Sequence, residues 1–277
     1  MPARAEGKVA FITGAGRGQG RSHAVRLAQE GADIIALDIC HDVAGALPMA
    51  TADDLAETVK LVEAQDRRII ATQADVRDFD AVKAAVDDGV AELGRLDIVL
   101  SNAGIVRLHA DSDDQEQLWQ DIVGTNLTGG FHVVNAAVPH LIAGGRGGVI
   151  VFTGSTAGVR PVANPGVGAL AYTASKWGLV GVCKQLAATL AQHSIRVNIV
   201  HPTGVASGMT MNAAMAELAE QAMAGGDANG MAAMQNALPV QILQPADISD
   251  AIAFLVSDQA KWITGVSLPV DAGFSIR

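Results

Sequence analysis

A single tyrosine, Tyr172, stands four residues before Lys176 in the sequence Tyr-Thr-Ala-Ser-Lys. On a helix, residues four apart share a face, so the phenol and the ammonium can lie together. A free phenol has a pKa of about 10, and a fixed ammonium nearby lowers that pKa because it stabilises the phenolate. The pair therefore predicts a general acid/base that takes the proton of an alcohol or returns it to a ketone. The alternative is a half-buried tyrosine beside an extended lysine.

Two further polar residues precede this pair. Ser155 follows an apolar run in Thr-Gly-Ser-Thr, from where its hydroxyl can hydrogen-bond the oxygen of a substrate. Asn126 lies inside a long helical pattern, where asparagine is a poor helix former. Its amide could hold a water that relays protons through Lys176. Taken alone, either residue is more often structural than catalytic.

A glycine-rich turn, Thr-Gly-Ala-Gly-Arg-Gly-Gln-Gly at residues 13–20, separates the first strand pattern from the first helical pattern. Glycine lets the backbone turn sharply and approach a pyrophosphate, and the following helix N-terminus offers amide donors. The pattern is TGxxxGxG and not GxGxxG. Its strand–turn–helix context favours a dinucleotide site over a purely structural turn. The candidate contacts are Gly14, Arg17, Gly18, Gln19 and Gly20.

Asp38 ends the second strand pattern and decides which dinucleotide we expect. A carboxylate there can accept hydrogen bonds from both adenosine ribose hydroxyls, and it would repel a 2′-phosphate. A solvated carboxylate at a strand end is the structural alternative. Arg17 favours NADP instead, because a cation in the turn could bind that phosphate. A buried carboxylate facing a phosphate is the costlier conflict, so the sequence predicts NAD.

The remaining candidate contacts to the cofactor follow successive strand patterns. Asp75 can hydrogen-bond the adenine amino group, and small residues after the fourth strand let a dinucleotide pass closely. Each could be ordinary loop chemistry, but together they favour one binding floor. These candidates are Ile39, Asp75, Val76, Asn102, Ala103 and Gly104.

Short apolar runs alternate with helical patterns along the whole chain. The runs are continuous, as is typical of strands covered by helices on both faces. They predict one α/β domain over residues 1–277, a Rossmann-type doubly wound three-layer sandwich with a seven-stranded parallel sheet. The strands are expected at residues 9–13, 34–37, 69–73, 98–101, 149–153, 197–200 and 266–270, and the helices at 18–30, 52–64, 81–93, 115–142, 172–192 and 248–256.

Two segments break this alternation. Residues 39–51 exceed the roughly 2–6 residues of an ordinary strand-to-helix loop, and we expect them to cover the cofactor. Residues 207–236 are the expected substrate lid, and residues 209–234 hold six of the eight methionines. Methionine suits a pocket for small apolar molecules of varied shape. Helical packing accounts for the methionines equally well.

Composition argues against several classes of function. A net charge of −10 would repel nucleic acid and anionic lipid. No apolar stretch is long enough for a membrane span, and the first residues lack the features of a signal peptide. Two cysteines outside any CxxC motif fit a reduced, cytoplasmic protein. The histidines show no metal-ligand spacing, and His201, before Pro202, is interpreted as a packing residue. Helices apolar on several faces indicate a homo-oligomer.

Four motifs in this order resemble the classical short-chain dehydrogenase/reductases across essentially the whole chain. They are TGxxxGxG at 13–20, Asn-Ala-Gly at 102–104, YxxxK at 172–176 and Pro-Thr-Gly at 202–204. The resemblance implies a catalytic tetrad of Asn126, Ser155, Tyr172 and Lys176. It implies cofactor contacts from Tyr172, Lys176, Pro202, Val205 and Ser207, with Lys176 on the nicotinamide ribose and the last two at the carboxamide. It also implies a homotetramer. The family usually has threonine at position 207, and its Pro-Gly pair is interrupted here by Thr203.

Several loops resemble the carveol-dehydrogenase-like, mycofactocin-associated subgroup. These are the long segment after Asp38, the stretches at 16–23 and 51–59, and the added residues around 162–170 between Ser155 and Tyr172. The subgroup implies NAD that is tightly held and recycled by a redox partner. It favours a neutral secondary alcohol, such as a terpenoid like carveol. The alternatives are an NADPH-dependent 3-ketoacyl-thioester reductase and a non-catalytic NAD-binding protein.

Overall fold

Seven parallel strands form one sheet in the order β3-β2-β1-β4-β5-β6-β7. The computed structural model describes residues 4–43, 48–107, 114–161, 166–212 and 235–277 of the chain. The strands are β1 Val9–Thr13, β2 Asp33–Asp38, β3 Ile69–Gln73, β4 Ile98–Ser101, β5 Gly148–Thr153, β6 Ile195–Pro202 and β7 Ser267–Val270. The predicted doubly wound sheet is confirmed.

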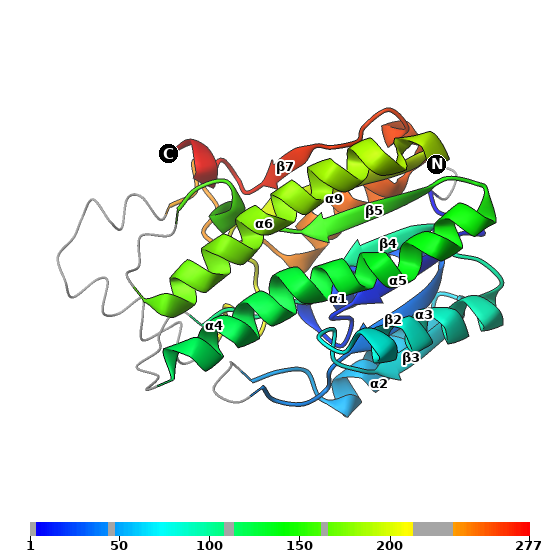
Figure 1. The fold of residues 1–277 in the computed structure, drawn as a ribbon, viewed down its shortest axis with the longest axis horizontal. Coiled ribbons are helices and arrows are strands. Elements are labelled where there is room, and N and C mark those ends of the chain that lie inside the picture. Colours follow the sequence, from blue (N-terminus) through cyan, green and yellow to red (C-terminus); the bar gives the residue numbers. More distant parts are fainter. Residues whose placement is uncertain (1–3, 44–47, 108–113, 162–165, 213–234) are drawn as a thin grey trace.

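Helices cover both faces of this sheet, with α5 and α6 lying side by side across the front in Figure 1. The front layer also holds α3, and α1, α2 and α9 pack behind the sheet. The helices are α1 Gly18–Gln29, α2 Ala52–Glu63, α3 Phe79–Leu93, α4 Gln115–Val123, α5 Gly129–Gly144, α6 Val167–Leu190 and α9 Pro245–Val256. Among the helices described, none is both long and apolar enough to cross a membrane.

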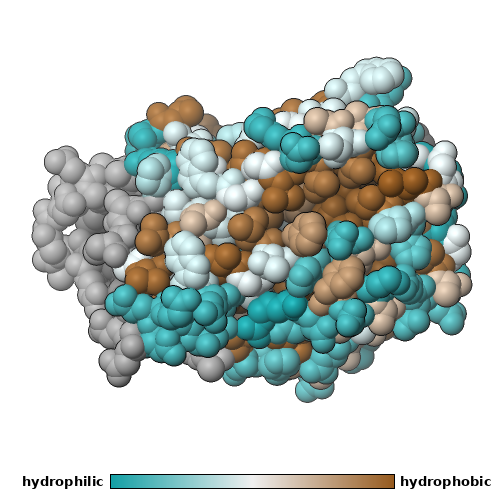
Figure 2. Space-filling model, in the orientation of Figure 1, coloured by the Kyte–Doolittle hydropathy of each residue, from teal (hydrophilic) through white to brown (hydrophobic). Residues whose placement is uncertain are grey.

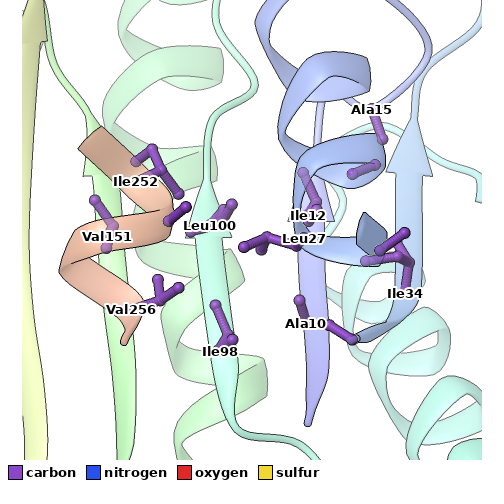
Figure 3. Packing of buried hydrophobic residues seen from close by; sticks show 14 of the residues in the cluster. Ala10, Ile12, Ala15, Leu27, Ile34, Ile98, Leu100, Val151, Ile252 and Val256 are labelled. Carbon is purple, nitrogen blue, oxygen red and sulfur yellow. The ribbon is translucent and has the colours of Figure 1, made fainter. Parts of the chain in front are cut away.

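Each central strand sends alternate side chains to the two helical layers. In β1, Ala10 and Ile12 enter the cluster with α1 and α9, whereas Val9 and Phe11 enter the cluster with α3, α5 and α6. Figure 3 shows the first cluster, in which Leu27 and Ile252 meet the strands from the helical side. Because both faces are buried, the strand patterns are continuous apolar runs.

Capping residues set where α2 and α3 begin and where α3 ends. Thr51 and Asp54 form a reciprocal capping box that starts α2, and this ends the long loop after β2. The Asp78 carboxylate accepts the Ala81 amide at the start of α3. Gly94 ends α3 with φ of 83°, a conformation that glycine adopts without strain.

Two helical predictions differ from the structure. Residues 115–142 form α4 and α5 joined by a π-helical turn, Gly124–Thr128, and not one regular helix. Weak helix formers fill this turn, and the Gly129 amide bonds the Gly124 carbonyl across it. The other difference is α6, which starts at Val167, five residues before Tyr172. Ala169 and Ala171 favour this extension because alanine is the best helix former.

Candidate active site

A cleft opens beyond the carboxyl ends of the strands, at the point where neighbouring β1 and β4 connect to opposite sides of the sheet. Ligands bind at this place in doubly wound sheets. The cleft encloses about 1160 Å³, part of it open to solvent. Its lining includes most of the predicted cofactor contacts, namely Gly14, Arg17, Gly18, Gln19, Gly20, Asp38, Ile39, Asp75, Val76, Asn102, Ala103, Gly104, Tyr172, Lys176 and Ser207.

The glycine-rich turn is fixed by its own conformation and by two neighbouring helices. Gly14 and Gly18 have φ of 67° and 56°, and a Cβ on Gly20 would lie 2.0 Å from the Gly14 carbonyl oxygen. Arg21 in α1 donates to the Gly16 carbonyl at 2.5 Å, and Thr58 in α2 donates to the Ala15 carbonyl at 2.9 Å. The turn is therefore shaped before a ligand arrives.

Gln19 supplies a direct indication that this turn holds a polar ligand. Its side-chain oxygen is buried and has no hydrogen-bond partner among the described residues. A buried acceptor without a donor costs about 1–3 kcal/mol. A hydroxyl or amide group of a bound dinucleotide would satisfy it, so the residues of the cleft fit the predicted cofactor.

Asp38 is buried, with 6% of its surface exposed, and backbone amides hold it. It accepts from the Gly16 amide at 2.7 Å and from the Cys40 amide at 3.3 Å. Burial, with the charge of Asp38 adding to it, raises the pKa of the Cys40 thiol to about 11. The guanidinium of Arg17 donates to the Pro48 carbonyl and lies against Gly208. Arg17 is thus already engaged by two loops.

Two predicted cofactor contacts, Asp75 after β3 and Asn102 after β4, form hydrogen bonds and ion pairs with other parts of the protein. Arg77 pairs with Asp75 at 2.6 Å and with Asp121 at 2.8 Å. Burial raises the pKa of Asp75, but its hydrogen bonds from Arg77 outweigh that effect, and the pKa falls below its usual value. Asn102 donates to the Thr13 carbonyl at 3.0 Å and accepts from Thr153 at 3.1 Å. Asn102 therefore joins the ends of β1, β4 and β5.

Tyr172 and Lys176 lie together on α6 at the cleft. The Lys176 ammonium is 5.5 Å from the centre of the Tyr172 ring and donates to the Thr153 carbonyl at 2.9 Å. Lys176 is buried, and burial lowers its pKa to about 8. The Ser155 side chain lies close enough to the Tyr172 phenol to act on its pKa as a hydrogen-bond donor. The structure thus brings together three of the four predicted catalytic side chains.

The pKa of Tyr172 does not follow the expectation drawn from Lys176. Burial raises the pKa of the phenol above its usual value, and the hydrogen bond from Ser155 is the effect that opposes the rise. The ammonium of Lys176 faces the ring and the Thr153 carbonyl. Ser155 is therefore the group in this structure that favours the phenolate.

Asn126 has a different set of contacts from the predicted one. Its side-chain oxygen accepts from the Ile105 amide at 2.8 Å, and its side-chain nitrogen donates to the Ile105 carbonyl at 2.9 Å and to Ser175 at 3.2 Å. The amide nitrogen is fully used, so the expected water cannot accept a hydrogen bond from it. Asn126 instead holds the segment after Gly104 beside Lys176.

Four predicted residues do not line the cleft. Asn126 and Ser155 lie directly behind it, Pro202 ends β6, and Val205 is buried and bridges to Leu243. The structure adds lining residues that the motifs did not indicate, among them Val43, Met49, Ala50, Ile105, Val106, Thr125, Thr153, Gly154, Gly208 and Met209. Their only sequence signal is proximity to a motif or to the long loop.

Part of the predicted substrate side lies outside the described residues. This applies to residues 213–234 of the predicted lid and to residues 162–165 of the added segment. Residues 44–47 of the predicted cofactor-covering loop also lie outside the described residues. Within the part that is described, no group of three or more histidine, cysteine, aspartate or glutamate side chains could hold a metal ion.

Comparison with known proteins identifies relatives over the full chain. The short chain dehydrogenase family model matches residues 8–218. A (-)-trans-carveol dehydrogenase of Rhodococcus erythropolis is 44% identical and covers 99% of this chain and 100% of its own. The crystal structure of a carveol dehydrogenase from Mycobacterium avium in complex with NAD has a TM-score of 0.91 and 48% identity, over 99% of this chain and 100% of that chain. A 3-oxoacyl-[acyl-carrier-protein] reductase of Staphylococcus aureus is 37% identical over 96% of this chain and 97% of its own.

Proposed function

The chain belongs to the short-chain dehydrogenase family, and on that premise we propose that it interconverts a small apolar secondary alcohol and its ketone with NAD, using Tyr172 as general acid/base. The observation that carries the proposal is the meeting of Tyr172, Ser155 and Lys176 at the end of the cleft. NAD, when bound, supplies the hydride acceptor or donor. The residues of the protein bind and orient the substrate, and they move the proton.

Each polar residue has a separate task in this proposal. Tyr172 takes the hydroxyl proton in the direction of oxidation and returns it in the direction of reduction. Ser155 hydrogen-bonds the phenol and stabilises the phenolate. Lys176 is held by the Thr153 carbonyl, at the bottom of the cleft. Asn126 fixes Ile105, which lines the same cleft.

The class of substrate follows from the apolar surroundings of Tyr172. Its ring packs against a cluster formed by Ile105, Leu118, Ile122 and Ala171. Ile105 of this cluster lines the cleft together with Val106 and Met209, and apolar side chains there suit a neutral, apolar molecule with one polar group directed at the phenol. The relatives named carveol dehydrogenase support a cyclic terpenoid alcohol as the first compound to test.

The decisive variant is Tyr172→Phe, which keeps the ring and removes the proton-transfer group. General acid–base catalysis contributes about 100- to 10,000-fold, so kcat for carveol oxidation should fall by at least that lower factor while NAD binding persists. Thr189→Val removes a hydroxyl that bonds only its own helix, at Gln185 and Leu186, and should leave kcat unchanged. Unchanged oxidation by Tyr172→Phe would refute the proposed role, and absence of any alcohol oxidation by the unaltered protein would favour a non-catalytic NAD-binding protein.

A 3-ketoacyl-thioester reductase is the second candidate, supported by the relative from Staphylococcus aureus. A substrate panel separates the two functions. We expect oxidation of terpenoid alcohols with NAD, and only weak reduction of acetoacetyl thioesters with either NADH or NADPH. Efficient reduction of the thioester with NADPH would support the second candidate over the first.

We also propose that the protein holds NAD tightly and passes its electrons to a redox partner, as in a mycofactocin-associated enzyme. The cofactor-covering loop, residues 39–51, supports tight binding because Met49 reaches the apolar cluster around Tyr172. Met49, Val43 and Ala50 line the cleft. Mass spectrometry of the purified, extensively dialysed protein should detect NAD at close to one equivalent per chain. A preparation free of cofactor would argue against tight binding.

We further propose that the protein is a homotetramer in which the α5–α6 face contacts a second copy. Figure 2 shows apolar residues gathered along these helices. Phe131 on α5 and Trp177 on α6 expose about half of their surfaces, 52% and 48%. Large aromatic rings at this exposure are typical of subunit contacts.

A further inference from the structure

His201 is a buried histidine at the end of β6, directly behind the Ser155 turn, residues 154–158. None of its surface is exposed. Its Nδ1 lies 2.7 Å from the Ser155 carbonyl oxygen, and its Nε2 lies 2.6 Å from the Ser267 hydroxyl of β7. Both ring nitrogens are therefore engaged, one by the turn that carries Ser155 and one by the neighbouring strand.

These two contacts define which nitrogen carries the proton. A carbonyl oxygen can only accept, so Nδ1 must donate to Ser155. The Ser267 hydroxyl can donate or accept, and in the neutral ring it donates to Nε2. Burial lowers the pKa of His201, with the Lys176 charge adding to it and the Ser155 hydrogen bond and Asp271 opposing it. The neutral ring in this tautomer is thus the stable form at neutral pH.

The ring of His201 also fills the space that shapes the turn. A Cβ on Gly154 would lie 2.6 Å from Nδ1, and a Cβ on Gly158 would lie 3.1 Å from Cε1. Both glycines on either side of Ser155 are thus packed against one imidazole. The turn has almost no room to move towards β6, because close-packed interiors resist small displacements.

We propose that His201 is a positioning residue, which holds the main chain of Ser155 so that the Ser155 hydroxyl meets Tyr172. The inference rests on the proposed function, because it assigns a task to Ser155 in that reaction. The Ser155 carbonyl accepts from two donors, the Gly158 amide at 2.8 Å and His201 at 2.7 Å. The Ser155 hydroxyl accepts the Ala157 amide at 3.1 Å, which leaves its own proton free for the phenol.

Loss of this support should raise the pKa of Tyr172, because Ser155 is the group that lowers it. The ionisable groups that face the two rings are Lys176 of α6 and Asp271 after β7, and neither is altered by the test. Alcohol oxidation needs the phenolate, so its rate rises with pH through the apparent pKa of Tyr172. The pH at which oxidation is half-maximal therefore reports on the Ser155 contact.

The test compares His201→Asn, whose amide nitrogen can donate to Ser155 as Nδ1 does, with His201→Leu, which has no donor. For the leucine variant we expect kcat to fall about tenfold and the half-maximal pH to move up by about half a unit, with NAD affinity unchanged. His201→Asn should recover kcat to within about threefold. Should His201→Leu not fold, His201→Val gives the same comparison, because valine has no donor and suits a strand.

A lower melting temperature with unchanged kcat and pH midpoint in the leucine or valine variant would overturn the proposal, since it would show a purely structural role. Equal losses in the asparagine and leucine variants would overturn it as well. Tyr172→Phe, measured alongside, separates a failure of the proposed function from a failure of the role inferred for His201. If Tyr172→Phe stays active, the proposed function fails, whatever the His201 variants show.

Discussion

Asp38 carries a buried carboxylate that backbone amides alone hold among the described residues. No described lysine, arginine or histidine forms an ion pair with it. A dianionic 2′-phosphate beside it would meet uncompensated repulsion in a region of low dielectric. Arg17 cannot easily turn to relieve this repulsion, because it is engaged by Pro48 and Gly208. The site is therefore set for NAD by a charge and by the absence of a nearby free cation in the described part of the cleft.

Asp38→Asn tests this charge with almost no change in size. We expect affinity for NAD to fall about tenfold, the effect of losing charge-assisted hydrogen bonds worth ~1.4 kcal/mol, and the preference over NADP to shrink by more than that. Titration calorimetry with both cofactors measures the ratio. Asp88→Asn, exposed on α3 and outside the cleft lining, is the control. A preference that survives in Asp38→Asn would mean that shape, and not charge, selects the cofactor.

At the residue scale, the gathering of the candidate residues at one cleft was more predictable from sequence than their contacts were. Tyr172, Lys176 and Asp38 were predictable because their residue types and their spacing suit proton transfer and ribose binding, and they line one cleft. The contacts of Asn126 were not, because its partner Ile105 is set by the packing of α4 against the segment after β4. His201 was interpreted as a packing residue and is indeed buried, but its bond to Ser155 depends on a pairing between distant strands that no local pattern encodes.

The cofactor-covering loop and the start of the predicted lid meet through one side chain. Arg17 donates to the Pro48 carbonyl and packs on Gly208, where a Cβ would lie 2.5 Å from Cζ of the guanidinium. It therefore joins two segments that both line the cleft, one through Met49 and Ala50 and the other through Ser207 and Met209. We therefore expect the release of NAD to require opening of this contact.

Arg17→Ala should speed the dissociation of NAD about tenfold, because one hydrogen bond is worth ~1.4 kcal/mol. Stopped-flow fluorescence of NADH release measures the rate. Arg17→Lys keeps the charge but lacks the planar fork that can bond one loop while packing on the other, so its release should be as fast as that of the alanine variant. A wild-type rate for Arg17→Lys would show that charge retains the cofactor and that the contact between the loops does not.

The π-helical turn between α4 and α5 offers a matched pair of glycines. A Cβ on Gly129 would lie 2.7 Å from Cγ2 of Val76, whereas a Cβ on Gly124 would meet Arg77 at an ordinary 3.6 Å. Gly129→Ala should lower the free energy of unfolding by about 1–3 kcal/mol through overpacking. Gly124→Ala should leave it unchanged or raise it slightly, because alanine is the better helix former. Urea unfolding of both variants measures the difference, and equal stabilities would contradict the tight packing inferred at Gly129.

The strands and helices were predictable where the pattern of apolar residues is strong, and they were less predictable where several glycines lie close together. The strands fell within two residues of their predicted ends, since a continuous apolar run must be buried on both faces. The break after Val123 was missed because Gly124 and Gly129 weaken a helix without indicating where it widens. The reach of Met49 across the cleft was also not predictable, because it depends on the position of α4 and α6 in space.

At the scale of the whole molecule, one outer face has no partner among the described elements. The two helical layers satisfy the sheet, but the outside of α5 and α6 keeps Phe131, Ile142, Leu170 and Trp177 in contact with solvent. Burying half of a tryptophan or phenylalanine side chain is favourable by roughly 2–3 kcal/mol at 25 cal/mol per Å². Symmetric pairing of this face doubles each such gain, because both copies of the chain bury the same residue.

Trp177→Glu should disrupt that pairing, since it places a carboxylate on the apolar face in the middle of α6, where burial against a second copy would leave the charge without a partner. Light scattering after size exclusion should change from the mass of four chains to that of two or one. Gln65→Glu adds the same charge at the end of α2, on the opposite helical layer, and should leave the mass unchanged. A tetramer that survives Trp177→Glu would mean that the subunits meet through another surface, and a monomer in the unaltered protein would exclude the assembly altogether.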